Sequence, residues 1–123
     1  MSDYKVNVIA SSRELTKMDK IRMKDTSDTI ALDGATQEGA VIFQPVAWVM
    51  LEIHNEKAQD GTYVNYIIQA ADGTKYRTGS ESFWKTFVSL WEDLEDEDGW
   101  EIKCYRLPSK NRPGKDFLTC SLV

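Results

Sequence analysis

The chain has few of the residues that build catalytic and metal centres. Among its 123 residues there is one histidine, His54, and there are two cysteines, Cys104 and Cys120. The cysteines do not stand in a metal-binding or redox-type spacing, and no serine, cysteine and acid arrangement repeats a nucleophile motif. We therefore expect no catalysis, no metal and no cofactor, and we interpret both cysteines as reduced thiols of the core.

Long apolar runs are also missing. No segment approaches the roughly 20 apolar residues of a membrane span, and the first residues lack the basic-then-apolar pattern of a secretory signal. The seven glycines are scattered and form no phosphate-cradling cluster. We expect a soluble cytoplasmic protein with no membrane partner, folded as one domain over residues 1–123. Residues 1–14 are predicted to form either an edge strand or a loose arm.

The formal charge of −5 is unevenly distributed along the chain. Six of the seven residues from Glu92 to Asp98 are acidic, so the remainder of the chain is slightly basic. A solvated helix end is one interpretation of this acidic run, and a docking patch for basic partners is the other. The cations gather in three segments, which are residues 17–24, 75–77 and 103–115.

Alternation of apolar and polar residues predicts most of the elements. Gln44–Ile53 is the most apolar run and is typical of a central strand, in which we place Trp48 in the core. Tyr66 is also predicted to be buried. An Asp72-Gly73 pair indicates a two-residue hairpin turn. The other predicted strands are Leu15–Lys24, Thr62–Ala70, Thr74–Thr78, Trp100–Leu107 and Asp116–Val123, and Thr26–Gly39 is predicted to be a loop or a ragged hairpin.

One segment follows a helical period instead. Phe83, Phe87, Leu90, Trp91 and Leu94 recur at steps of three and four residues, which predicts an amphipathic helix over residues 81–97. We expect Trp84 and Trp91 to plug one end of a barrel. Strands, one helix and a closing hairpin predict an all-β fold with one helix, an OB-like five-stranded Greek-key barrel that is partly open. A sandwich with the helix across one sheet face fits the same order.

The last two strands flank a basic loop and supply the main candidate site. Their alternation predicts that Lys103, Tyr105 and Phe117 share one face, beside the loop cations Lys110 and Arg112. Single-stranded nucleic acid is bound by this combination of cations for phosphates and flat rings for bases. Lys115 also lies in the loop and belongs to this main site. The further candidate nucleic-acid contacts are Lys20, Arg22, Lys24, Tyr63, Lys75, Tyr76 and Arg77.

Several of these features together resemble a known family. The segment Ala70-Ala-Asp-Gly-Thr-Lys-Tyr76, the helix after it, the basic loop and the terminal Asp116-Phe-Leu-Thr-Cys-Ser-Leu122 are similar, in order and length, to single-stranded DNA-binding proteins of small tailed bacteriophages that replicate by protein priming. The likeness covers about residues 40–123. The resemblance implies an OB-like fold that coats displaced strands during phage DNA replication, without catalysis. Four tryptophans and the acidic helix end depart from the family pattern.

The predicted function is therefore non-catalytic, largely sequence-independent binding of single-stranded DNA, in the host cytoplasm if the protein is viral. This prediction requires the cations and rings to converge into a single trough. Replication proteins and further copies of the chain are the other partners left open. A phage protein-interaction module that docks through the acidic helix end is the alternative function.

Overall fold

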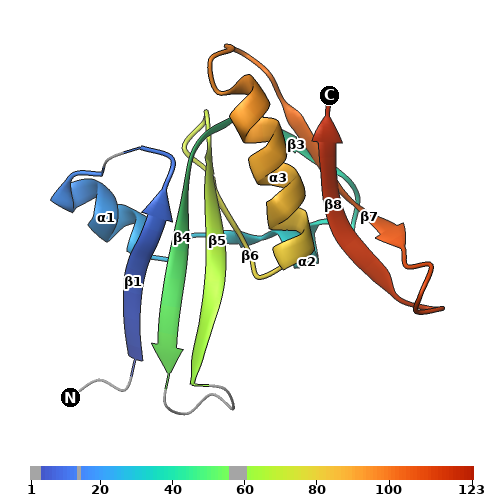
Figure 1. Cartoon of the computed structure of the whole chain (residues 1–123), viewed down its shortest axis with the longest axis horizontal. Helices are drawn as coiled ribbons and strands as arrows, with labels where there is room; N and C mark the ends of the chain where they lie inside the picture. Colours follow the sequence, from blue (N-terminus) through green and yellow to red (C-terminus); the bar gives the residue numbers. More distant parts are fainter. Residues whose placement is uncertain (1–3, 14, 56–60) are drawn as a thin grey trace.

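A computed structural model describes residues 4–13, 15–55 and 61–123 of the chain (Figure 1). In chain order the elements are β1 (Tyr4–Ser11), α1 (Lys17–Lys24), β2 (Ile30–Ala31), α2 (Leu32–Ala35), β3 (Val41–Phe43), β4 (Pro45–Asn55), β5 (Thr62–Ala70), β6 (Lys75–Thr78), α3 (Glu81–Leu94), β7 (Ile102–Pro108) and β8 (Asp116–Leu122). No helix in these ranges is long and apolar enough to cross a membrane.

The strands form two sheets that share one stretch of chain. Five strands pair in the order β1-β4-β5-β6-β2, and three pair in the order β3-β7-β8. Only Gln44 separates β3 from β4, so the chain passes from one sheet into the other at this residue. The mostly β architecture is confirmed. Within the described ranges, however, no pairing connects β8 to β6 or β2, and the sheets do not close into a barrel.

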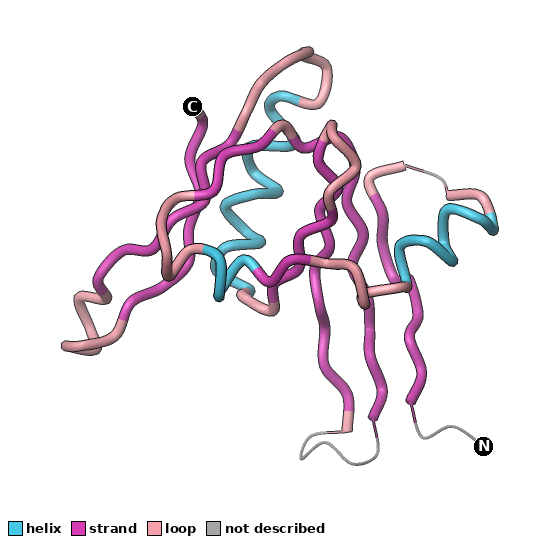
Figure 2. The backbone as a smooth tube through the Cα atoms, turned by 180° about the vertical axis from the view of Figure 1, so that it is seen from behind, coloured by secondary structure: helices cyan, strands magenta, loops and turns pink. Residues whose placement is uncertain are grey.

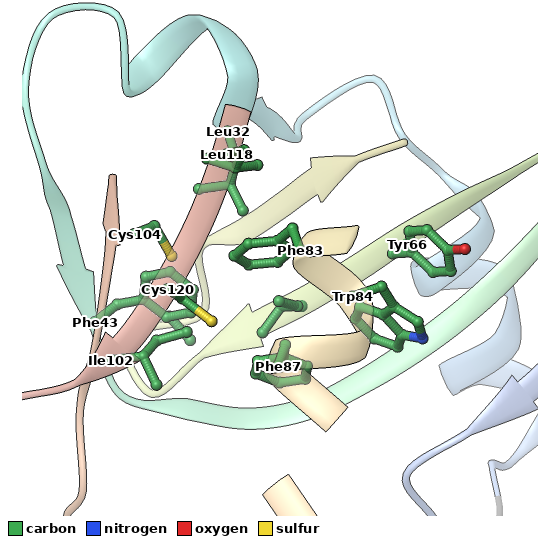
Figure 3. Packing of buried hydrophobic residues seen from close by; sticks show 12 residues of the cluster. Leu32, Phe43, Tyr66, Phe83, Trp84, Phe87, Ile102, Cys104, Leu118 and Cys120 are labelled. Atoms are coloured by element: carbon green, nitrogen blue, oxygen red, sulfur yellow. The ribbon is translucent and has the colours of Figure 1, made fainter. Parts of the chain in front are cut away.

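The main core lies between α3 and the two sheets (Figures 1 and 3). Ser80 caps α3 by accepting a hydrogen bond from the backbone N–H of Phe83, and the buried side chains Phe83, Trp84 and Phe87 follow on one helix face. Trp84 stacks on Tyr66 at 4.5 Å between ring centroids. The predicted helix is confirmed but ends at Leu94 rather than at residue 97, and the predicted burial of Tyr66 is confirmed.

A second cluster covers the opposite face of the five-stranded sheet. Val49, Leu51 and Ile53 of β4 and Ile67 of β5 are almost completely buried there with Met23 of α1. The central strand β4 therefore has apolar neighbours on both of its faces, which explains its nearly continuous apolar sequence. Trp48, on the other face of β4, is partly buried against the main core, edge-on to Trp84 at 5.3 Å.

The prediction of a strand over Leu15–Lys24 is wrong, because this segment contains α1. Thr16 and Asp19 form a capping box: the Thr16 side chain accepts from the Asp19 backbone N–H, and the Asp19 carboxylate accepts from the Thr16 backbone N–H. The box satisfies backbone donors that a helix start would otherwise leave unpaired. Asp19 and Met23, four residues apart, face the sheet. With α2, the described chain has three helices where one was expected.

The N-terminal segment forms an edge strand over most of its described length. β1 pairs antiparallel with β4 from Tyr4↔Asn55 to Ser11↔Val49, so the loose-arm alternative is wrong for residues 4–11. The turn after β5 also differs from the prediction, because three residues rather than two separate Ala70 from Thr74, whose carbonyl accepts from the Ala70 N–H. Gly73 adopts φ +91°, as the last position of such a turn requires.

Candidate nucleic-acid interface

The β7–β8 hairpin places the predicted contacts on its outer face. The register pairs Tyr105 with Thr119 and Leu107 with Phe117, while Cys104 pairs with Cys120 on the buried face. Because neighbouring residues of a strand point to opposite faces, Lys103, Tyr105 and Phe117 lie together on the side away from the core. The predicted sharing of a face by these three residues is confirmed.

This outer face combines a cation with the exposed ring of Phe117, the half-buried ring of Tyr105 and apolar side chains. The Lys103 Nζ lies 5.4 Å from the centroid of the Tyr105 ring, which is within the range of a cation–π contact. Phe117 is 40% exposed, and Ile42 of β3, which pairs with Lys103, is 53% exposed. The face can therefore offer both flat π-surfaces and positive charge to a ligand.

The loop between β7 and β8 carries three exposed cations, Lys110, Arg112 and Lys115. Two backbone hydrogen bonds close the loop: the N–H of Ser109 donates to the Lys115 carbonyl at 2.9 Å, and the N–H of Lys115 donates to the Arg112 carbonyl at 3.0 Å. No ion pair within the described residues involves the three cations. A groove of about 860 Å³ runs from the loop to the first turn of α3. It is lined by Ser82, Leu107, Pro108, Asp116, Phe117 and the loop residues Ser109, Lys110, Asn111, Arg112 and Lys115.

Arg106 of β7 was not among the predicted site residues, and it joins the two strands at the loop end of this hairpin. Its Nη2 donates to the Asp116 carboxylate at 2.6 Å, and its Nη1 lies 3.8 Å from the carboxylate of Asp33 in α2. The hydrogen bond from Arg106 lowers the pKa of Asp116 below its ordinary value. Arg106 lies on the same face of β7 as the buried Cys104. A charged residue at a position that the alternation assigns to the core is the signal that could have identified this structural role.

Two predicted contacts on β6 have structural roles instead. Lys75 is 8% exposed, and its Nζ donates to the backbone carbonyls of Arg22 at 2.6 Å and Asp25 at 2.8 Å, beside the Asp28 carboxylate at 2.9 Å. The ammonium group thus holds the C-terminal end of α1 against the sheet. Tyr76 is half-buried and stacks on Phe43 at 4.4 Å in the main core. Neither side chain is presented to a ligand, so both predictions are corrected.

Tyr63 and Arg77 lie on the face of the five-stranded sheet that is opposite α3. Their cross-strand partners are Ile53 and Ile67, which belong to the second cluster. Tyr63 is 42% exposed, as predicted. Arg77 is half-buried, and its Nη1 is enclosed without a hydrogen-bond partner among the described residues. Neither residue extends the surface of the β7–β8 hairpin.

Lys20, Arg22 and Lys24 are exposed on α1, which projects beside β1 on the side of the molecule away from the hairpin (Figures 1 and 2). The prediction of a row of cations along one strand face is therefore wrong, because in a helix Lys20 and Lys24, four residues apart, share one face while Arg22 lies on another. The cations do not converge into a single trough. They form two separate groups, one on α1 and one on the hairpin, so the expected convergence of all predicted contacts is wrong. Among the predicted contacts in the described chain, only the loop cations Lys110, Arg112 and Lys115 line a common groove with an exposed ring, that of Phe117.

The two cysteines are free and face each other across β7 and β8 inside the main core (Figure 3). Burial raises the pKa of Cys120 to about 12 and also raises the pKa of Cys104. Both thiols therefore remain protonated at neutral pH, as core residues do. In the described part of the chain, no group of three or more metal-ligating side chains occurs.

Comparisons with known proteins gave no relative. No family model, no curated protein and no solved structure matches the chain.

Proposed function

We propose that this protein binds single-stranded DNA without catalysis and that the binding surface is the outer face of the β7–β8 hairpin with its loop. The observation that carries the proposal is the shared face of Lys103, Tyr105 and Phe117 next to three loop cations that no carboxylate neutralises within the described residues. Stacking on exposed rings contributes about 1–3 kcal/mol per base and tolerates any sequence, and cations follow the phosphates.

In the described part of the chain, the hairpin is one of two basic surfaces, and the other is α1. Residues 102–122 contain five cationic side chains and one carboxylate, although the whole chain carries −5. Arg106 is paired with Asp116, so Lys103, Lys110, Arg112 and Lys115 are the cations left for phosphates. Four such contacts predict that log K falls with log salt with a slope of about −3 for a single strand.

The order of strand pairing supports an OB-like interpretation of the fold. Strands β3 and β4 are nearly continuous and together correspond to the first strand of an OB fold. In this pair, β4 pairs with β5 and β3 pairs with β7, and α3 lies between β6 and β7 in the sequence. This pairing order is compatible with an OB-type barrel that is left open between β6 and β8 and has β1 and β2 as additional strands. In OB folds the loop between the last two strands is one of the ligand-binding loops, and here that loop is the basic one.

The biological role rests on the resemblance of residues 40–123 to phage single-stranded DNA-binding proteins. We infer that the protein coats and protects displaced strands during phage DNA replication in the host cytoplasm. Sequence-independent contacts to backbone and base faces suit this role, because a coat protein must accept every sequence of the genome.

A titration with poly(dT) at low salt tests the proposal. We expect quenching of intrinsic tyrosine and tryptophan fluorescence that reverses as NaCl is added. Phe117→Ala and Tyr105→Ala should each weaken binding by about 1–3 kcal/mol. Unchanged fluorescence and electrophoretic mobility at micromolar protein and low salt would exclude single-stranded DNA as the ligand.

Two triple variants with the same charge change locate the surface. Lys110→Ala/Arg112→Ala/Lys115→Ala should reduce the affinity and flatten its salt dependence. The matched control, Lys20→Ala/Arg22→Ala/Lys24→Ala, removes three exposed cations from α1 and should bind poly(dT) as the wild type does. The opposite ranking of the two variants would move the interface from the hairpin to α1.

A further inference from the structure

A small pocket beside the C-terminal end of α3 combines aromatic walls with acidic residues. Trp91 of α3 and Trp100 form two of its walls, with ring centroids 5.9 Å apart and ring planes at 65°. Both rings are partly buried against the main core. The pocket has a volume of about 170 Å³, and its remaining lining is Gln44, Pro45, Val46, Glu95, Glu97 and Asp98. Indole faces next to carboxylates favour a cationic side chain as the occupant.

The negative charge around this pocket is not compensated within the described part of the chain. Glu95, Glu97 and Asp98 are exposed, and no ion pair there involves any residue of the acidic run. The last turn of α3 also contains no basic residue. Carboxylates at this end of a helix are disfavoured by the helix dipole and by each other. A cationic partner would relieve both effects.

Helix α1 carries the complementary surface. Asp19 and Met23 face inward, and the outward side presents Met18, which is 62% exposed, and Ile21, which is 68% exposed. The exposed cations Lys17, Lys20 and Lys24 lie along one side of these apolar side chains and are in no ion pair with a described residue.

We propose that α1 of one copy docks on the Trp91–Trp100 pocket of a second copy. A lysine of α1 enters the pocket over the indole faces, its neighbours pair with the surrounding carboxylates, and Met18 and Ile21 cover the apolar rim. Charge complementarity identifies a second copy as the occupant, since the chain itself carries both surfaces. The two surfaces lie on different parts of the molecule (Figure 1), so the contact is head-to-tail.

This contact leaves the β7–β8 hairpin free, because the hairpin belongs to neither surface (Figures 1 and 2). The inference does not depend on nucleic-acid binding, and it is tested in the absence of DNA. Failure of the proposed function would therefore not change its outcome.

A charge swap tests the contact with two variants of the full chain. The first, Lys20→Glu/Lys24→Glu, makes α1 acidic, and the second, Glu95→Lys/Glu97→Lys, makes the pocket basic. All four side chains are exposed and belong to no ion pair with a described residue, so we expect both variants to fold. Lys5→Glu/Lys85→Glu is the control with the same charge change as the first variant at exposed positions outside both surfaces.

Sedimentation velocity at low salt gives the readout. We expect the apparent mass of the wild type and of the control to rise with concentration to about twice the monomer mass of 14.1 kDa or more, and to return to the monomer value at high salt. Each charge-reversal variant alone should remain a monomer. An equimolar mixture of the two should associate as the wild type does, because each then meets an oppositely charged partner. A monomeric wild type, association of either variant alone, or a mixture that stays monomeric would overturn the inference.

Discussion

Substitution of Lys75, the buried lysine of β6, gives a quantitative test of how α1 is held against the sheet. Replacement by methionine keeps most of the buried stem but removes the ammonium group. That group donates two hydrogen bonds to backbone carbonyls at the C-terminal end of α1 and lies 2.9 Å from the Asp28 carboxylate. If the structural role is correct, Lys75→Met should detach α1 from the sheet.

The expected loss of stability follows from these contacts. A hydrogen bond from a charged group contributes about 1.5–3 kcal/mol. The Asp28 side chain is 65% exposed, so water screens the ion pair and it adds less than about 1 kcal/mol. Water can partly replace the ammonium at the freed carbonyls, and we expect the free energy of unfolding to fall by about 2–4 kcal/mol in total.

Urea denaturation measures this loss, and Lys85→Met is the matched control. Lys85 forms an exposed ion pair with Glu81 at 3.4 Å within α3, and its loss should cost less than about 0.5 kcal/mol. Hydrogen exchange should show faster exchange of the α1 amides in Lys75→Met only. A Lys75→Met variant as stable as the control would refute the anchoring role. The anchoring role would also be refuted if the folded Lys75→Met variant lost as much affinity for poly(dT) as Phe117→Ala does.

Phe87→Ala removes a completely buried ring from the contact between α3 and the sheets, so the free energy of unfolding should fall by about 3–5 kcal/mol in urea denaturation; a loss below about 1 kcal/mol would contradict this packing. Because burial raises the pKa values of Cys104 and Cys120, a thiol reagent such as DTNB should modify both only on unfolding, and rapid labelling of the native protein would contradict their burial. The pKa of Asp116 is lowered in the folded state by Arg106, so its contribution to stability is present above the unfolded value of about 4 and is lost as the pH falls through the folded value. The stability difference between wild type and Asp116→Asn should therefore shrink between about pH 7 and about pH 3, and parallel pH profiles would exclude this linkage.

The elements with a strong period were predictable from the sequence. The period of α3, the alternation in β5 and β8 and the apolar run of β4 each report a local geometry, which the backbone adopts because one face must be buried. The same alternation correctly placed Lys103, Tyr105 and Phe117 on one face of the hairpin.

The short segment before Asp25 was predicted incorrectly because its pattern fits two geometries. Ile21 and Met23 alternate with cations as in a strand, yet Ile21 is exposed and only Met23 is buried. The residues Thr16 and Asp19, at capping-box spacing, were the local signal for a helix. A segment of eight residues contains too few repeats for alternation alone to distinguish a strand from a helix.

The sequence by itself determined which segments alternate, where the long helix lies and which residues of the last hairpin share a face, because these properties depend on residues a few positions apart. Only the tertiary structure decided that Lys75 serves α1, whose carbonyls lie 50 and 53 residues earlier in the chain. It alone also separated the cations into two groups. Long-range pairing sets both outcomes, since the distance between side chains on different elements depends on how the sheets and helices pack and not on their spacing in the sequence.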